Sequence, residues 1–439
     1  MTPWLLFEKE RLTPMQLTHL SLTDFRNYAR LDVTVPAGPI LFVGGNAQGK
    51  TSLLEAIYYL ATFVSFQATH DRQLVNLHAE RKPVAVAKIY AHFVRTREEK
   101  NSTGAVDGSL QSGAFTSGDH TLEVRLILQP NGFNNTPRLR KEILLDGVKR
   151  KTGEAIGAFN AVLFLPHMLR VVEGPPVERR RYLNLLLVQV QPHYAKMLSE
   201  YNRCLTQRNA LLKQLGDRGG DLDQLDYWDE QLTTIGAYLI NARIHAIQAL
   251  EGLASRMHNK LTREQEVLRL SYQPSYDPLA RSSDQFELPL DAPLDRSGLS
   301  LEKIQAGFLQ RLNSLRREEI ARGITTVGPH RDEFRLLGNG IDLGIYGSRG
   351  QARTAVLSLK LAEVSWMKEK TGQWPVLLLD EVLAELDPDR RYDLLTRLSE
   401  SEQAMLTTTD LNLFSGEFVQ TSTLWNIHAG QLHEERNGT

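Results

Sequence analysis

Gly44-Gly45-Asn46-Ala47-Gln48-Gly49-Lys50-Thr51 is the stretch of this sequence that decides the fold. It fits the pattern G-x-x-x-x-G-K-[ST] in full, in which glycines let the backbone curl so that its N–H groups face phosphate oxygens. The apolar residues 40–43 before it predict a buried strand, and the periodicity of residues 53–61 after it predicts an amphipathic helix. This order indicates a nucleotide-binding α/β core, and a chance glycine turn is the weaker interpretation.

Each residue type in this loop has an expected role. Lys50 should reach the β- and γ-phosphates of ATP, and Thr51 should ligate Mg²⁺. The N-terminus of the following helix adds partial positive charge. The expected nucleotide-binding residues of the loop are Gly44, Asn46, Gly49, Lys50, Thr51 and Ser52.

A second apolar run, Val376-Leu377-Leu378-Leu379, ends in the acid pair Asp380 and Glu381. Asp380 suits the coordination shell of Mg²⁺. Glu381 suits the positioning or deprotonation of an attacking water. A strand end exposed to solvent, where acids are common, is the alternative interpretation. A phosphate loop in the same chain favours the catalytic one, with Lys50, Asp380 and Glu381 as catalytic residues.

The distance between these two motifs predicts how the chain is organised. About 330 residues separate Lys50 from Asp380, so the ATPase core should be split by an insertion. Helical periodicity over residues 192–257 and 301–322 supplies that insertion. Residues 101–120, rich in Gly, Ser and Thr, should form a surface loop. The predicted parts are an extension (1–14), the N-terminal part of the head (15–180), an inserted helical lobe (181–322) and the C-terminal part of the head (323–439).

Composition limits the partners of the chain. Its 439 residues include 51 basic and 52 acidic side chains, a net charge of −1, so any DNA contact must come from local basic patches. A single cysteine, Cys204, excludes an internal disulfide and suits a reducing compartment. No run approaches the roughly 18 apolar residues that a membrane span needs. A cytoplasmic protein without a membrane partner is therefore expected.

Three charged clusters have open interpretations. Arg179-Arg180-Arg181 could bind DNA phosphates, or it could form ion pairs at a lobe junction. Lys149-Arg150-Lys151 is interpreted as an exposed basic turn, with DNA contact as the alternative. Arg316-Arg317-Glu318-Glu319 is most simply a solvated helix face.

Further motifs follow one another in a definite order. They are Phe25-Arg26-Asn27-Tyr28, Gly174-x-Pro176-x-x-Arg179, Gly328-Pro329-His330-Arg331-Asp332-Glu333, Tyr346-Gly347-Ser348-Arg349-Gly350-Gln351 and Glu385-Leu386-Asp387. From about residue 15 to residue 410, this order resembles the RecF family of bacterial recombination mediators, within the ABC and SMC class of ATPases. In that resemblance the segment at Ser348 is the signature motif, which adds Ser348 to the catalytic residues, and the segment at Asp387 is the D-loop.

The resemblance implies an α/β fold, an ABC/SMC-type P-loop ATPase head with an inserted helical lobe. It adds Arg26, Asn27, Ser348, Gly350, Gln351 and Asp387 to the expected nucleotide-binding residues, and Thr51 and Asp380 as the metal ligands. ATP with Mg²⁺ would be sandwiched between two subunits, so that Ser348, Gly350 and Gln351 of one meet the γ-phosphate held by the other. The implied activity is a weak, DNA-stimulated ATPase that acts as a conformational switch.

The implied partners are double-stranded DNA and gapped junctions of single- and double-stranded DNA, a second copy of the chain, and RecR, with RecO and RecA in the pathway. The implied role is RecA loading at gaps coated by single-strand-binding protein, in repair, replication restart and the SOS response. The chain departs from the family pattern at His167 and Met168, where acidic residues are usual, and at Arg349 in the signature. Thr408-Thr409-Asp410 replaces a switch histidine, which implies slow ATP turnover.

Two other classes remain as alternatives. A transporter ATPase is opposed by the helical insertion, by the incomplete L-S-G-G-Q and by the start at Phe25-Arg26-Asn27; co-purification with a membrane permease would favour it. An ATPase-coupled nuclease needs a C-terminal acidic domain, whereas only about thirty residues follow Asp410. Metal-dependent DNA cleavage by the pure protein would favour that class.

Overall fold

The computed structural model describes residues 15–81, 84–95, 117–129, 138–279, 295–399 and 401–435. The predicted extension, residues 1–14, and most of the predicted surface loop, residues 101–116, lie outside these ranges. The chain divides into two compact units, Met1–Pro166 with Met367–Thr439, and His167–Trp366. The second unit contains the whole predicted lobe, residues 181–322, and extends beyond it at both ends.

The first unit contains an antiparallel six-stranded sheet in the order β2-β1-β4-β5-β6-β7. Its strands are β1 (Gln16–Phe25), β2 (Tyr28–Thr34), β4 (Ala85–Arg95), β5 (Gly118–Gln129), β6 (Arg138–Leu145) and β7 (Val148–Arg150). Burial alternates along β4, where the small and apolar residues face inward. Because side chains of a strand alternate between faces, one face of this sheet covers a core and the other carries polar groups.

The second sheet of this unit is mixed, in the order β15-β14-β3-β13-β12-β8. Its strands are β3 (Gly38–Val43), β8 (Ala161–Phe164), β12 (Val376–Asp380), β13 (Gln403–Thr408), β14 (Thr423–His428) and β15 (Gln431–Glu435). All neighbours pair in parallel except β15 with β14. The carboxyl ends of β3, β12 and β13 therefore meet at one edge, where ligands bind in open α/β sheets.

Helix α1 (Lys50–Thr62) contacts strands of both sheets. Ten of its thirteen residues are buried, so the helix is enclosed on nearly all sides and not only on the single apolar face that its periodicity predicted. The shorter helices of the unit are α2 (Thr152–Ala155), α9 (Pro388–Ser399) and α10 (Gly416–Thr421), with 3₁₀ turns at Asp71–Leu74, Ala79–Arg81, Val382–Glu385 and Leu411–Leu413.

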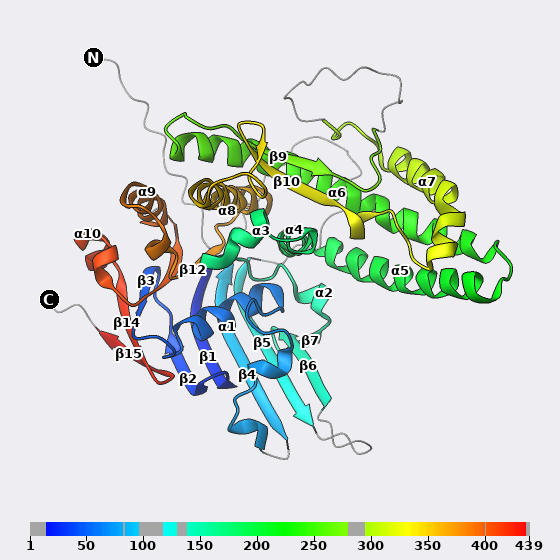
Figure 1. Cartoon of the computed structure of the whole chain (residues 1–439). Coiled ribbons are helices and arrows are strands. Elements are labelled where there is room, and N and C mark those ends of the chain that lie inside the picture. The colour runs from blue at the N-terminus through cyan, green and yellow to red at the C-terminus, as the bar shows by residue number, and fades with distance from the viewer. Residues whose placement is uncertain are drawn as a thin grey trace. The chain divides into compact units, whose positions relative to one another are not determined.

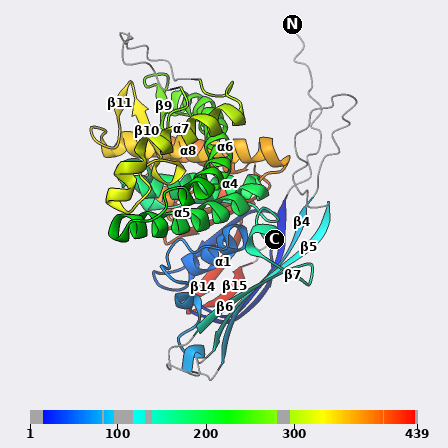
Figure 2. The ribbon, with the colours of Figure 1, turned by 90° about the vertical axis from the view of Figure 1, so that its right-hand side faces the viewer.

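The second unit is mainly helical (Figure 1). It contains α3 (Arg170–Glu173), α4 (Pro176–Val190), α5 (Pro192–Arg218), α6 (Gln224–Leu261), α7 (Leu301–Arg322) and most of α8 (Arg349–Thr371), a sheet of β9 (Leu268–Gln273), β10 (Glu333–Gly338) and β11 (Ile341–Asp342), and a 3₁₀ turn at Pro329–Arg331. Helices α5, α6 and α7 lie side by side (Figures 1 and 2). No helix in the part of the chain that the structure describes is long and apolar enough to cross a membrane.

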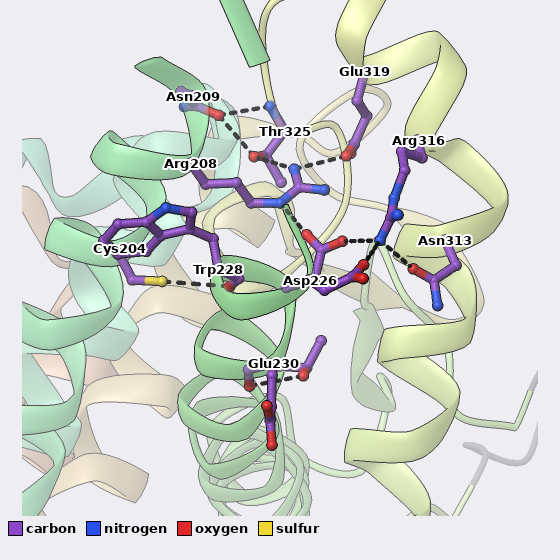
Figure 3. Close-up of polar contacts among 12 residues, drawn as sticks. Cys204, Arg208, Asn209, Asp226, Trp228, Glu230, Asn313, Arg316, Glu319 and Thr325 are labelled. Carbon is purple, nitrogen blue, oxygen red and sulfur yellow. Dashed lines mark hydrogen bonds and ion pairs between the residues drawn. The ribbon is translucent and has the colours of Figure 1, made fainter. Parts of the chain in front are cut away.

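A buried charge network joins these three helices (Figure 3). The Arg208 guanidinium of α5 donates from Nε to Asp229 Oδ1 of α6 at 2.6 Å, and its Nη1 lies 2.7 Å from Glu319 Oε2 of α7. Arg316 of α7 also reaches Asp229, at 2.9 Å. Glu319 is fully buried, so the prediction of a solvated face for residues 316–319 is wrong for Arg316 and Glu319. Their partners lie on other helices, which the local charge pattern does not contain.

Candidate functional site

The phosphate loop lies between β3 and α1, as the sequence predicts, and its backbone geometry depends on two glycines. Gly44 has φ +156°, and a Cβ there would stand 2.4 Å from the carbonyl oxygen of Ile427 in β14. Gly49 has φ +118°, and a Cβ there would stand 2.6 Å from Asn27 Nδ2. Both positions exclude side chains, because close neighbours occupy the space and because the left-handed backbone favours glycine.

Two turns hold the loop from outside. From the β1–β2 turn, Asn27 Nδ2 donates to the Gln48 carbonyl at 3.0 Å and the Tyr28 hydroxyl donates to the Gly49 carbonyl at 3.0 Å. From the β14–β15 turn, the Gly430 N–H donates to the Gln48 carbonyl at 2.9 Å. Sequence reasoning assigned Asn27 to the nucleotide and missed the β14–β15 turn, whose Ala429-Gly430 dipeptide is only a general turn signal. These neighbouring residues therefore support the conformation of the loop backbone.

The Lys50 ammonium is folded back into the loop. Its Nζ donates to the carbonyls of Gly44 at 2.7 Å and Gly45 at 2.9 Å, and it lies 3.4 Å from Glu381 Oε1. Only 4% of the Lys50 side chain is exposed. A buried cation in a curl of backbone is well placed to receive phosphate oxygens, because desolvation strengthens the attraction.

Asp380 and Glu381 end β12 beside the loop. Asp380 Oδ1 accepts hydrogen bonds from Thr51 Oγ1 at 2.9 Å and from Thr407 Oγ1 at 2.8 Å. The Thr407 hydroxyl also accepts from the backbone N–H of Glu381 at 2.9 Å. Thr407 faces Asp380 because the parallel register of β12 and β13 pairs these two residues. Only Thr408, Thr409 and Asp410, in place of a switch histidine, were predicted from the sequence to bear on ATP turnover at this strand end; Thr407 was not predicted.

The electrostatics of Asp380 follow from its depth. Burial, the largest effect, raises the pKa of the Asp380 carboxyl, and the nearby Glu381 raises it further. The hydroxyls of Thr407 and Thr51 and the charge of Lys50 oppose this rise. A cation bound nearby would stabilise the ionised form of this carboxyl strongly, because the site is partly desolvated.

A cavity of about 1110 Å³ opens over the loop. Its lining residues from the expected nucleotide-binding and catalytic set are Arg26, Asn27, Asn46, Gly49, Lys50, Thr51, Ser52 and Glu381. A second wall, which the sequence analysis did not assign, comes from the segment after α1 and includes Gln67, Arg72 and His78. The volume slightly exceeds the roughly 300–1,000 Å³ usual for small-molecule and cofactor sites.

Arg26 lines this cavity, but most of the hydrogen bonds of its guanidinium go to other residues of the protein. Its Nε and Nη2 donate to the two carboxylate oxygens of Glu55 at 2.7 and 2.8 Å, and Nη1 donates to the Gln73 carbonyl at 3.0 Å. Glu55 is fully buried and also accepts from the Ser65 hydroxyl. A bidentate pair with a buried carboxylate is strong and directional. Arg26 therefore ties the β1–β2 turn to α1 as well as facing the cavity.

The signature residues lie in the second unit, at the start of α8. Ser348 and Gln351 form a capping box: Ser348 Oγ accepts from the Gln351 N–H at 3.2 Å, and Gln351 Oε1 accepts from the Ser348 N–H at 3.0 Å. Ser348 and Gly350 are exposed. Asp387 caps α9, accepting at Oδ1 from the Arg390 N–H at 3.0 Å. The sequence analysis named these residues without predicting either cap.

The structure decides between the two interpretations of the cluster Arg179-Arg180-Arg181 in part. Arg179 is 1% exposed, and its guanidinium pairs with Glu333 and donates to three backbone carbonyls. Arg180 donates from Nη1 to the Asp332 carbonyl at 2.9 Å, and burial lowers its pKa. The ion-pair interpretation thus holds for Arg179. Residues 149–151 are exposed, as predicted, but Lys149 and Arg150 belong to strand β7, so the prediction of a turn is wrong for these two residues.

The split parallel sheet, the phosphate loop and the acid pair at its edge define a P-loop ATPase head of the ABC and SMC class with an inserted helical unit. Residues 16–423 match the model of the RecF/RecN/SMC N-terminal domain family. Curated proteins of Roseiflexus castenholzii and Chloroflexus aurantiacus, both named DNA replication and repair protein RecF, are 36% and 37% identical over 95% of this chain and 100% and 99% of theirs. This chain belongs to the RecF family.

Solved structures agree with this assignment. A structure of the recombination mediator protein RecF with ATP in the RecFOR pathway superposes with a TM-score of 0.78 at 27% identity, covering 98% of this chain and all of that one. A second structure of the same mediator, RecF-ATPrS, superposes with a TM-score of 0.77 at 28% identity, covering 96% of this chain and 99% of that one. The predicted fold class and the family resemblance are therefore confirmed.

Proposed function

We propose that this chain is an ATP-dependent DNA-binding protein of recombinational repair and replication restart, in which ATP closes a dimer and hydrolysis opens it. The observation that carries the proposal is the hydrogen bond between Thr51 and Asp380, which joins two motifs 329 positions apart beside the cavity over the phosphate loop. Membership of the RecF family supports the role in repair.

The donor set fits ATP with Mg²⁺. Backbone N–H groups at the start of α1 and the Lys50 ammonium suit the phosphates, and the Thr51 hydroxyl and Asp380 carboxylate are the hard oxygen ligands that Mg²⁺ prefers. Bound there, the metal would neutralise charge on the phosphates. The residues fit this ion because Thr51 and Asp380 already lie within 2.9 Å of each other.

Glu381 is the expected proton acceptor for the attacking water. Its side chain is 42% exposed beside Lys50, so it can reach a water in the cavity. Its backbone has φ +52°, a left-handed conformation that is rare for a residue other than glycine. The hydrogen bond from its N–H to Thr407 Oγ1 helps to hold this conformation, which directs the side chain out of the strand.

The dimer would form through the signature motif. Ser348, Arg349 and Gly350 are exposed, and the N-terminus of α8 can meet the γ-phosphate held by a second copy of the chain. Ile345 and Tyr346 just before it are 62% and 76% exposed. Large apolar side chains exposed beside a polar anion-binding turn are typical of a contact surface. The site would hydrolyse ATP slowly, with stimulation by DNA.

The proposed partners follow from the family. Double-stranded DNA and gapped junctions would bind the closed dimer, RecR and RecO would act with it, and RecA would be loaded at gaps coated by single-strand-binding protein, in the cytoplasm and as part of the SOS response. Because the net charge is −1, we expect local basic patches to supply DNA affinity. The logarithm of the affinity should fall linearly with the logarithm of the salt concentration.

Gel filtration with and without ATP and gapped DNA tests the proposal. The parent should run as a monomer alone and as a dimer with both ligands. Lys50→Met should lose ATP binding, and Ser348→Arg should bind ATP as a monomer but fail to dimerise. A mixture of the two variants should recover part of the hydrolysis, since one composite site then carries neither defect. No recovery on mixing would show that Ser348 does not act across the dimer.

The same preparations separate the two alternative classes. Cleavage of DNA by the pure protein with Mg²⁺ would favour an ATPase-coupled nuclease. Co-purification with a membrane permease would favour a transporter subunit. An ATP-dependent gain in affinity for gapped DNA, without cleavage, is the result that the proposal expects.

A further inference from the structure

The turn after α6 has an unusual backbone that directs Glu266 toward α8. Arg263 and Glu264 have φ +51° and +64°, two consecutive left-handed residues that are not glycine. Such a turn is strained and persists only where other contacts hold it. The Thr262 hydroxyl donates to the His258 carbonyl at 2.8 Å and accepts from the Glu266 N–H at 3.3 Å, which fixes both sides of the turn.

Both carboxylate oxygens of Glu266 are engaged by functional or buried partners. Oε1 accepts from the side-chain amide of Gln351 at 2.9 Å, and Oε2 lies 3.1 Å from His258 Nε2. His258 is fully buried, and its other ring nitrogen lies 3.1 Å from the hydroxyl of Ser358 in α8. Glu266 and His258 thus connect the end of α6 with two points on α8, seven residues apart.

The Gln351 carboxamide is held at both ends. Its oxygen accepts from the Ser348 N–H, and its nitrogen donates to Glu266. Because a carboxamide has one acceptor end and one donor end, the Glu266 carboxylate selects the orientation in which the oxygen faces Ser348. Ser348 Oγ also accepts a hydrogen bond from the backbone N–H of Gln351. The hydrogen of the Ser348 hydroxyl is then available to donate to a ligand.

We infer that Glu266 is a positioning residue for the signature motif: by orienting Gln351, it keeps the Ser348 hydroxyl and the N-terminus of α8 ready for the γ-phosphate of a second copy. This inference rests on the proposed ATP-dependent dimer. Glu266 acts through Gln351. Preorganised donors cost no rearrangement when the anion arrives, so the loss of Glu266 should weaken closure without changing ATP binding by the monomer.

Three single variants test the inference in the full chain. Glu266→Ala removes both contacts, whereas Glu266→Gln keeps an acceptor for the Gln351 amide. Gln265→Ala is the matched control, because Gln265 is exposed in the same turn and its side chain forms no hydrogen bond among the described residues. ATP affinity of the monomer, ATP-dependent dimerisation by analytical ultracentrifugation and steady-state hydrolysis are measured for each, with hydrogen exchange of residues 344–354 as a readout without ATP.

We expect Glu266→Ala to dimerise about tenfold more weakly, the loss of one charge-assisted hydrogen bond. Hydrolysis per dimer should fall, and exchange at 344–354 should rise, while ATP affinity of the monomer is kept. Glu266→Gln should recover most of the dimerisation, and Gln265→Ala should match the parent. Glu266→Ala combined with Gln351→Ala should dimerise no more weakly than Gln351→Ala alone, because Glu266 is inferred to act on dimerisation only through Gln351.

Additive losses in the double variant would overturn the inference, since Glu266 would then act by another route. Equal dimerisation of Glu266→Ala and the parent would overturn it and leave the proposed function standing. A parent that binds ATP but never dimerises would overturn both. Loss of monomer ATP affinity in Glu266→Ala would indicate a general structural defect and also count against the positioning role.

Discussion

Thr407→Val is the substitution that best tests the geometry beside the phosphate loop. Valine keeps the size and branching of threonine, so the packing of β13 should survive. The hydroxyl is lost, and with it the hydrogen bond to Asp380 Oδ1 at 2.8 Å and the acceptor for the Glu381 N–H at 2.9 Å. A single side chain thus supports both acids of the site.

The magnitude of the effect follows from these two bonds. Removing an outer partner of a metal-ligating group costs about 10- to 100-fold in metal affinity or activity. The loss of the Thr407 donor also raises the pKa of Asp380 further, because that hydroxyl now opposes the effect of burial. The partly buried N–H of Glu381 would lose its acceptor, at a cost of about 1 kcal/mol.

Titration of Mg²⁺ against ATP binding and hydrolysis measures the change. We expect Thr407→Val to need about 10- to 100-fold more Mg²⁺ for half-maximal activity, with ATP binding in EDTA unchanged. Thr407→Ser should retain most of the activity. Thr62→Val is the matched control, because it removes another buried threonine hydroxyl, which donates to the Tyr58 carbonyl at the far end of α1.

The pH dependence has a definite sign. As the proposed ligand of Mg²⁺, the Asp380 carboxyl has to be ionised, so Mg²⁺ binding should be lost as pH falls through the raised pKa of Asp380. In Thr407→Val this loss should begin at a higher pH than in the parent. If the variant and the parent share the same Mg²⁺ and pH dependence, Thr407 does not support the site, and the assignment of Asp380 to the metal rests on its hydrogen bond with Thr51 alone.

Three further predictions concern the loop, the acids and the helical unit. Asn27→Ala should raise the Kd for ATP several-fold in equilibrium binding, because a hydrogen bond of about 1 kcal/mol to the loop is lost; an unchanged Kd would mean that the loop is held without it. Glu381→Gln should bind ATP and accumulate the dimer, whereas Asp380→Ala should weaken Mg-ATP binding itself; equal losses would contradict their separate roles. Arg208→Met should destabilise the helical unit by about 3–5 kcal/mol in urea denaturation, since it removes the arginine that pairs with the buried Glu319 and leaves Asp229 with Arg316 alone. The exposed Arg203→Met is its control, and a cost below about 1 kcal/mol would show that the network relaxes.

Local signals in the sequence were enough to predict the phosphate loop and its flanking elements. The glycine pattern, the apolar strand and the helix periodicity all lie within about twenty residues, so no tertiary information is needed. The prediction of a split core rests on sequence distance, because about 330 residues separate Lys50 from Asp380. The position of Thr407 was not, since it depends on the register between β12 and β13, which a single sequence does not contain.

The helices of the second unit were predictable from local patterns, but the charged residues buried between them were not. The helical periodicity over residues 192–257 and 301–322 predicted the helices of α5, α6 and α7. The short strands β9 and β10 and the helix α4 were not predicted. Glutamate and arginine are usually exposed on helices, so the burial of Glu319 could be inferred only from partners on two other helices.

Arg26 and Arg179 show why motif membership alone does not assign a role. Both belong to motifs of the RecF family, and each forms a bidentate pair with a carboxylate, Arg26 with Glu55 and Arg179 with Glu333. Arg179 is buried, and the third nitrogen of its guanidinium donates to backbone carbonyls. A DNA phosphate could therefore reach Arg179 only by breaking a buried ion pair. Arg26 keeps 22% of its side chain exposed and lines the cavity, so a phosphate or ribose could approach it while Glu55 stays bound. The difference lies in burial, which is set by the packing around each arginine and not by the motif that contains it.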